Sequence, residues 1–280
     1  MKVTLWGTRG SLATPGPETM RYGGNTSCVS VQGADGTLLV LDAGTGIRRL
    51  ASTLSNGLRR VDILLTHLHM DHIQGLGFFA PLREPGFEVH IWGPASTTLS
   101  LRTRLGRYLS PPLFPVHLRD LPCMLLLHEV PCMGTSIGEF TVSSALICHP
   151  DTTVGYRIEG PGGTVTYLPD HEPALGMRPD EFPLASEWTS GHALAADADL
   201  LIHDAQYNDD EYEEKVGWGH STLRQAIKFA CLAQVKELVP FHHDPAHSDD
   251  YLDSLMGDAI AAERPPFTVT PGMEGTAFDL

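Results

Sequence analysis

One short stretch, Thr66 to His72, constrains this chain more than any other part of its sequence. It reads Thr-His-Leu-His-Met-Asp-His, so three histidines and one aspartate fall within six residues. The apolar run 61–65 before it predicts a buried strand, and residues 73–76 after it predict the start of a helix. Imidazole nitrogens and carboxylate oxygens are the donors that zinc, iron and manganese accept. Open α/β folds place their sites on loops at the carboxyl ends of strands, so we predict a metal site here.

The spacing of these four donors favours two centres. His67 and His69 are two residues apart, so an extended loop can point both side chains the same way. Asp71 and His72 follow where the helix begins and can face a second centre. The alternative is a helix start with solvated histidines. Four donors in six residues at a strand–loop–helix junction disfavour that alternative.

Length and charge narrow the class of protein. The chain has 280 residues, 42% of them hydrophobic, which is enough for a substantial core. We find no repeat, linker or low-complexity segment, so we expect one domain over residues 1–280. A balance of 19 basic and 34 acidic residues gives a net charge of −15. That charge makes binding of a long nucleic acid unfavourable, but it allows a small anionic substrate held by metal ions.

The cysteines and the amino-terminal residues point to the cytoplasm. The five cysteines are odd in number and form no Cys-X-X-Cys pair, which favours reduced and mostly buried thiols. The chain starts directly with a predicted strand, without a signal peptide. No apolar run approaches the ~20 residues of a membrane span. The cysteines are Cys28, Cys123, Cys132, Cys148 and Cys231.

Strands and helices alternate along most of the chain. Predicted strands cover 2–6, 28–31, 38–41, 61–65, 88–92, 124–130, 139–148, 154–158, 164–168, 199–202, 237–241 and 267–270. One short predicted helix ends near residue 54. Further predicted helices cover 73–83, 95–108, 223–232 and 248–262. Residues 110–116 contain three prolines and predict an ordered loop that covers a pocket or meets a partner subunit. Arg102, Arg104 and Arg107 form the densest basic cluster, which we interpret as a solvated helix face.

Further candidate donors follow other predicted strands. One centre would take His67, His69 and His149, the other Asp71, His72 and His242, and Asp170 would be shared. His243 competes with His242, and His203 with His220. Open positions filled by water indicate a catalytic site rather than a closed structural one. Asp42 ends a buried strand, where a carboxylate needs partners, so we expect it to orient a ligand histidine.

The predicted chemistry is metal-assisted hydrolysis. Two metals about 3.5–4 Å apart hold a hydroxide between them and accept both oxygens of an in-line displacement. We predict Asp71, His220 and Asp204 as catalytic residues, with His220 as general acid and Asp204 setting its tautomer. The alternative for His220 is a structural role beside Ser221 at a helix start. Substrate contacts are predicted for Arg9 and Asn25, which otherwise serve their loops, and for an aromatic residue, Trp218 or Tyr207, that stacks on a base.

These residues resemble those of the metallo-β-lactamase superfamily, in the phosphodiesterase branch related to the tRNA 3′-end-processing endonucleases. The resemblance covers nearly the whole chain and implies a four-layer αβ/βα sandwich of two mixed β-sheets. It also implies two zinc ions per chain, although manganese or iron would accept the same donors. It favours His242 over His243 and makes His220 the catalytic histidine. It rests on residues 66–72, Asp42-Ala43-Gly44, His149, Asp170, Gly219-His220-Ser221-Thr222 and Phe241-His242.

The predicted substrate is small. The chain lacks the long Gly/Pro-rich arm of the tRNA-processing enzymes, and its segments 5–11 and 23–28 are similar to those of cyclic-nucleotide phosphodiesterases, the anti-Pycsar enzymes among them. Those relatives are homodimers in which a loop of one subunit closes the other's site, a role that residues 110–116 would fill here. We therefore predict a dinuclear phosphodiesterase for a small nucleotide, foremost a 3′,5′-cyclic one.

Three alternatives stay open. A tRNA 3′ endonuclease would use the same chemistry on a larger substrate. A lactonase or other hydrolase would not need His220. A metal-holding sensor would not turn over, but such proteins commonly lack a ligand, whereas the ligand set here is complete.

Overall fold

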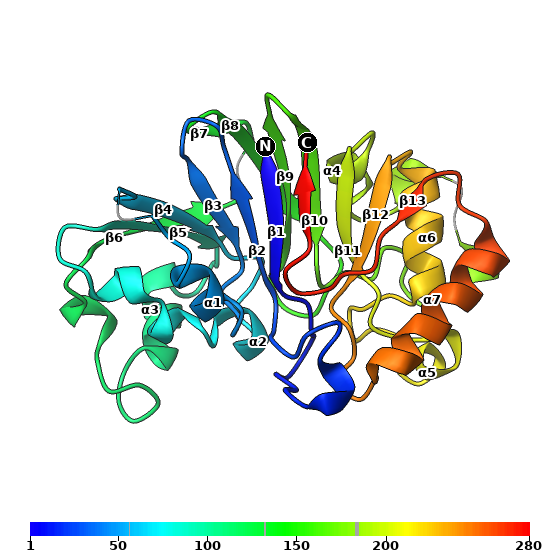
Figure 1. Cartoon of the computed structure of the whole chain (residues 1–280), viewed down its shortest axis with the longest axis horizontal. Helices are drawn as coiled ribbons and strands as arrows, with labels where there is room; N and C mark the ends of the chain where they lie inside the picture. Colours follow the sequence, from blue (N-terminus) through cyan, green and yellow to red (C-terminus); the bar gives the residue numbers. More distant parts are fainter. Residues whose placement is uncertain (56, 132, 183–184) are drawn as a thin grey trace.

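The computed structural model describes residues 1–55, 57–131, 133–182 and 185–280, so the prediction for Cys132 lies outside the described residues. Two seven-stranded sheets pack against each other (Figure 1). The first has the order β14-β1-β2-β3-β4-β5-β6. Its strands are β1 (Lys2–Gly7), β2 (Cys28–Gln32), β3 (Leu38–Leu41), β4 (Arg60–Leu64), β5 (Glu88–Pro94), β6 (Met124–Val130) and β14 (Ala277–Asp279).

The second sheet has the order β13-β12-β11-β10-β9-β8-β7. Both sheets are mixed: β3 to β6 and β10 to β13 run parallel, and the remaining neighbours pair antiparallel. Its strands are β7 (Thr135–Ile137), β8 (Phe140–Leu146), β9 (Val154–Gly160), β10 (Gly163–Leu168), β11 (Leu200–Asp204), β12 (Glu237–Phe241) and β13 (Thr268–Val269).

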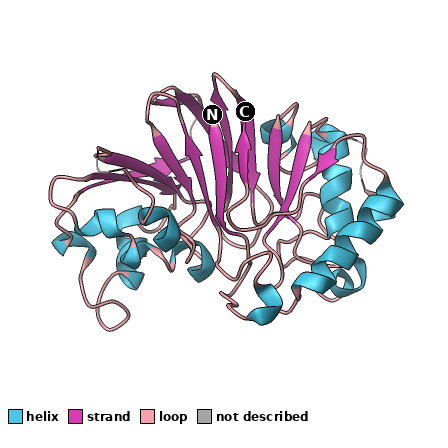
Figure 2. Cartoon of the chain, viewed as in Figure 1, coloured by secondary structure: helices cyan, strands magenta, loops and turns pink. Residues whose placement is uncertain are grey.

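Helices cover the outer face of each sheet (Figure 2), which confirms the predicted αβ/βα sandwich. Buried residues such as Leu39, Tyr156 and Ile202 fill the space between the sheets. Each sheet also packs against its helices through one further apolar cluster. The helices are α1 (Ile47–Ala51), α2 (Met70–Ile73), α3 (Leu101–Tyr108), α4 (His192–Ala195), α5 (Asp209–Glu213), α6 (Leu223–Leu232) and α7 (Asp249–Glu263).

Parallel strands of both sheets bring their carboxyl ends to one edge of the sandwich. Asp42 follows β3, the segment 66–72 follows β4, and Asp204 ends β11. Asp170 and His242 follow β10 and β12. This common edge places residues that are far apart in sequence within reach of one another.

The predicted helix over 73–83 is wrong. The α-helix α2 already ends at Ile73, and residues 76–78 and 80–83 form separate 3₁₀ turns. Gly75, Gly77 and Pro81 interrupt the pattern, because glycine and proline both disfavour a continuous helix. The predicted helix over 95–108 begins only at Leu101, where the Ser100 side chain caps it. The short strands β7 and β14 were not predicted.

The expectations for the arginines of α3 and for the cysteines agree with the structure in most respects. Arg102 and Arg107 are exposed on α3, as predicted for a solvated face, whereas Arg104 is partly buried and donates to the carbonyl oxygen of Pro94. Among the described cysteines, all are free thiols; Cys28 and Cys123 are buried, and Cys231 is exposed. No helix in the described ranges has the length and apolar character needed to cross a membrane.

Candidate metal centre

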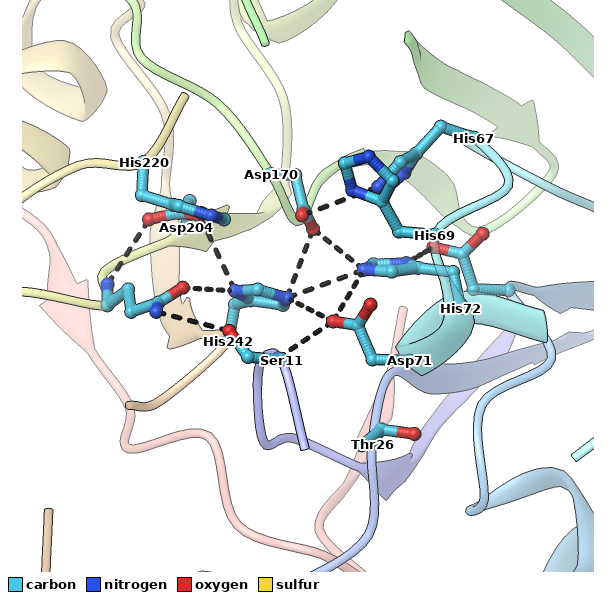
Figure 3. Close-up of polar contacts among 12 residues, drawn as sticks. Ser11, Thr26, His67, His69, Asp71, His72, Asp170, Asp204, His220 and His242 are labelled. Atoms are coloured by element: carbon cyan, nitrogen blue, oxygen red, sulfur yellow. Dashed lines mark hydrogen bonds and ion pairs between the residues drawn. The ribbon is translucent and has the colours of Figure 1, made fainter. Parts of the chain in front are cut away.

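Two groups of four donors meet at the common strand edge, and Figure 3 labels every member of them except His149. Within each group, one ligand atom from every residue lies within 4.8 Å of the others. The inner donor group is entirely buried, whereas the outer donor group includes the exposed His69 and the partly exposed His149. Asp170 belongs to both groups. The outer donor group is His67, His69, His149 and Asp170, and the inner donor group is Asp71, His72, Asp170 and His242.

Hydrogen bonds fix the tautomers of three of these histidines. His72 Nδ1 lies 2.7 Å from Asp42 Oδ2, and His242 Nδ1 lies 2.9 Å from Gln206 Oε1. His149 Nδ1 lies 2.9 Å from the carbonyl oxygen of Gly219. Each partner is an acceptor, so each Nδ1 donates and each Nε2 keeps its lone pair for another partner. The predicted role of Asp42, orienting a ligand histidine, matches this contact.

The free nitrogens of the inner donor group point at the same small volume. His72 Nε2 and His242 Nε2 are 3.4 Å apart. Asp170 Oδ1 lies 2.9 Å from His72 Nε2 and 3.2 Å from His242 Nε2. Asp71 Oδ2 lies 3.2 Å from His242 Nε2. Lone pairs that face one another in a buried place need a positive charge between them, which a divalent metal supplies.

The outer donor group has the same character. His149 Nε2 lies 3.4 Å from His69 Nδ1 and 3.7 Å from Asp170 Oδ2. The buried His67 Nε2 has no hydrogen-bond partner and lies 3.6 Å from Asp170 Oδ2. An orphaned buried nitrogen aimed at a carboxylate and two imidazoles fits a metal ligand.

The pKa shifts agree with two clusters that attract a cation. Burial lowers the pKa of His67 well below its usual range, so this side chain is a neutral ligand. Burial also acts to lower the pKa of His72, but Asp170, Asp71 and Asp42 together raise it well above the usual value. The inner donor group therefore favours a positive charge at His72, which a bound metal replaces.

His220 and Asp204 form a hydrogen-bonded pair beside the inner donor group, and together with His242 they make a third, smaller group of possible metal ligands. His220 Nδ1 lies 2.7 Å from Asp204 Oδ2, and the His220 ring stacks on His242 with 5.0 Å between centroids. Burial lowers the pKa of His220 and raises that of Asp204. The backbone N–H of Ser221 donates to the other Asp204 oxygen over 2.8 Å. The residue that caps α6 is Thr222 rather than Ser221, so the cap does not explain His220.

The competing histidines of each pair lie in different surroundings. His243 is buried and donates from Nε2 to the carbonyl oxygen of Gly272 over 2.9 Å, away from the donors. His203 packs against His171, with 2.9 Å between ring nitrogens. His242 and His220 are therefore the members of each pair that face the donor groups.

Two predicted substrate contacts need correction. Arg9 is fully buried, and its guanidinium donates to the carbonyl oxygens of Gly23, Asp244 and His247, so it holds the loops together instead of reaching a substrate. Tyr207 is also buried, which removes it as a stacking partner for a base.

The other two candidates for substrate contact differ in availability. The Asn25 side chain donates to Glu274 over 3.0 Å, so its amide is engaged within the protein. Trp218 is 60% exposed and lies two residues before His220. Its contact with substrate stays a prediction.

Sequence reasoning missed several residues that complete the site. The Ser11 backbone N–H donates to Asp71 Oδ2 over 2.8 Å. The two residues are 60 positions apart, so no local sequence pattern predicts this contact. Gln206 could have been found, because it follows Asp204 by two residues at a strand end. Glu172, which lies two residues after Asp170, is buried. Gly10 leaves room for the imidazole of His242, since a Cβ at Gly10 would lie 2.4 Å from His242 Nδ1.

Comparison with known proteins agrees with this architecture. Residues 37–243 match the model of the beta-lactamase superfamily domain. A ribonuclease Z from Crocosphaera subtropica is 30% identical over 243 residues, which cover 71% of this chain and 75% of that protein.

Two solved structures share the fold. The metallo-beta-lactamase fold protein YhfI from Bacillus subtilis has a TM-score of 0.70 at 21% identity, with 100% of this chain and 98% of that chain covered. The short form of human tRNase Z has a TM-score of 0.68 at 22% identity, with 100% and 99% covered.

Proposed function

We propose that this chain, which belongs to the beta-lactamase superfamily, is a metal-dependent phosphodiesterase of the branch that includes ribonuclease Z. The observation that carries the proposal is the buried Asp204–His220 pair, placed directly beside two donor groups that share Asp170. Metal donors alone suit many hydrolases. A positioned acid next to them suits a reaction with an alkoxide leaving group.

The residues have distinct roles in this mechanism. Two divalent ions held by the donor groups, zinc by their ligand chemistry, supply when bound a nucleophilic hydroxide and charge stabilisation at the phosphate. Asp204 accepts from His220 Nδ1 and stabilises the protonated ring. His220 Nε2 donates its proton to the leaving oxygen, and burial favours this transfer because it lowers the pKa of His220. Asp71 and Asp170 keep the donor groups anionic.

Charge and surface chemistry support a small substrate. The net charge of −15 opposes the binding of a long phosphate backbone. Three large apolar side chains that adjoin site residues in the sequence are exposed: Leu12 at 61%, Met70 at 50% and Trp218 at 60%. Such side chains suit a flat organic group better than a polyanion. We propose a 3′,5′-cyclic nucleotide whose base lies against Trp218.

A second candidate is RNA 3′-end cleavage. It is favoured by the relative named ribonuclease Z, of which this chain covers 75%. It would need a route for a long polyanion into the site of an acidic protein.

We further propose a homodimer. Residues 110–116 pack onto the protein through Phe114, whose ring lies 6.0 Å from that of Phe78. Leu113 in this loop is 70% exposed and Phe78 is 56% exposed, so a second copy would bury apolar surface there. Measurement of the molar mass in solution tests this state. A cytoplasmic location stays a prediction.

The test is a turnover assay on protein of known metal content. Substrates are bis-p-nitrophenyl phosphate, a panel of 3′,5′-cyclic nucleotides and a tRNA with a 3′ extension. Hydrolysis of cyclic nucleotides supports the full proposal. Cleavage of the tRNA alone would favour the second candidate, RNA 3′-end cleavage. Inactivity of fully metallated protein toward every diester would contradict the phosphodiesterase function.

A further inference from the structure

A further buried carboxylate near the site, that of Glu172, has no role in the mechanism above. Glu172 is 1% exposed and lies two residues after the shared donor Asp170. Its Oε1 accepts from the Tyr212 hydroxyl over 2.5 Å and from Gly176 N over 3.3 Å. Its Oε2 accepts from Gly217 N over 3.1 Å and from Gly219 N over 3.0 Å. A carboxylate is costly to bury, so this array of donors keeps it in place.

Two of these donors belong to the segment 216–219, which we call the glycine loop. Gly217 and Gly219 have φ values of +85° and +87°, which are unfavourable for other residues. Between them, Trp218 projects into solvent. The N–H groups on both sides of this tryptophan therefore point inward at one carboxylate.

The glycine loop contacts both the metal donors and the general acid. The carbonyl oxygen of Gly219 accepts from His149 Nδ1 over 2.9 Å, which fixes a member of the outer donor group. A Cβ at Gly219 would lie 2.2 Å from that nitrogen, so the contact is close. His220 follows directly in the chain. Any shift of this loop would move His149, Trp218 and His220 together.

We propose that Glu172 is a positioning residue that anchors the glycine loop and so sets His220 against the leaving oxygen and Trp218 against the substrate. The part that concerns His220 and Trp218 rests on the proposed function. The anchoring itself does not, because it follows from hydrogen bonds within the chain. The role differs from that of Asp204, which touches His220 directly, since Glu172 acts through two glycine amides.

Glu172→Gln is the informative substitution. Glutamine has nearly the same size, but its NH₂ group brings a donor where two or more N–H donors already converge. We expect amide exchange at Gly217 and Gly219 to accelerate about tenfold, as for the loss of one net hydrogen bond. Acrylamide should also quench Trp218 more strongly, with Trp218→Phe identifying its share. Both measurements apply to metal-free and metal-loaded protein.

Activity supplies a readout that a purely structural role would not change. A p-nitrophenolate leaves without a proton, whereas an alkoxide needs one. Glu172→Gln should therefore lower kcat for an alkyl phosphodiester about tenfold more than kcat for bis-p-nitrophenyl phosphate, at unchanged metal content. Glu139→Gln is the matched control, because Glu139 accepts from the backbone N–H of Ala34 in a distant hairpin. Tyr212→Phe, which removes a single donor, should give a smaller change in the same direction.

The outcomes separate the two proposals. Unchanged exchange at Gly217 and Gly219 in Glu172→Gln overturns the anchoring. An equal fall of kcat for both diesters, with faster exchange, overturns the link to His220. Inactivity of the unsubstituted protein toward all diesters sinks the proposed function, and amide exchange then still decides the anchoring.

Discussion

The inner and outer donor groups share Asp170 but differ in how firmly the protein holds them. In the inner group, His72 and His242 donate from Nδ1 to side chains of Asp42 and Gln206, and every member is buried. In the outer group, His69 is exposed and His149 is held by a backbone carbonyl on the glycine loop. Oriented, desolvated ligands bind a metal more tightly. We therefore expect the inner group to retain its metal and the outer group to exchange it and to face the substrate.

The largest effect should come from the residue that both groups share. Asp170→Ala removes a ligand from each, so we expect loss of bound metal at both and a fall in turnover on the order of 10⁴-fold, since each metal contributes several kcal/mol. Metal analysis by mass spectrometry and a diester assay measure this. Asp120→Ala, at an exposed aspartate, is the control. Loss of metal from a single group would show that Asp170 does not bridge them.

His220→Gln tests whether the acid is separate from both donor groups. We expect kcat toward an alkyl phosphodiester to fall about 10²–10³-fold while metal content stays unchanged, because the role proposed for His220 is to move a proton and not to hold a metal. Paired metal analysis and kinetics decide this. Retained activity would favour a lactonase-type reaction instead, and loss of metal would make His220 a ligand.

A pH titration of stability compares the histidines of the two donor groups with His203, a buried histidine that belongs to neither group. Burial lowers the pKa of His203 to about 4 from an ordinary value of 6.5. The unfolded chain then takes up a proton below pH 6.5 that the folded chain refuses until about pH 4. Stability should thus be full above pH 6.5 and decrease by about 3 kcal/mol as the pH falls to about 4.

Urea denaturation of metal-free protein at several pH values measures this loss. His203→Gln should flatten the slope over the same window. An unchanged slope would assign the acid sensitivity to other groups.

Asp42→Asn should affect the inner group more than the outer group, which Asp42 reaches only through Thr66. The substitution keeps the shape but removes the charge that orients His72, so we expect the tighter metal to bind about 10–100-fold more weakly. Titration with competing chelators measures both affinities. Equal weakening at both groups would show that they are coupled through Asp170 more strongly than their separate hydrogen bonds suggest.

Residues whose local sequence decides their structure were predictable. Helix α6 and strand β12 have the predicted bounds, since Thr222 and Gln225 form a capping box and residues 238–241 form a short apolar run. The donors lay in short segments at strand ends, which local patterns reveal. The fold itself was inferred by resemblance, because no local pattern encodes which of many strands pair.

Contacts between distant segments were not predictable. Arg9 looked available in a glycine-rich loop, yet it is buried by residues 244–249 near the other end of the chain. Glu172 resembled any acidic residue beside a proline, and only folding brings two glycine amides to it. Three-residue strands such as β7 carry too few side chains to show alternation.

The distribution of the donors over both sheets also sets an order of events during synthesis. The segment 66–72 leaves the ribosome before Asp170, which follows β10, and well before His242, which follows β12. Until then, a nascent chain displays three histidines and an aspartate without the partners that complete either group. Domains fold largely as units, so the metals would enter after β12 has joined its sheet. A chain interrupted before β12 should bind metal loosely and without selectivity, and only a chain that already contains β12 and His242 would be able to retain it.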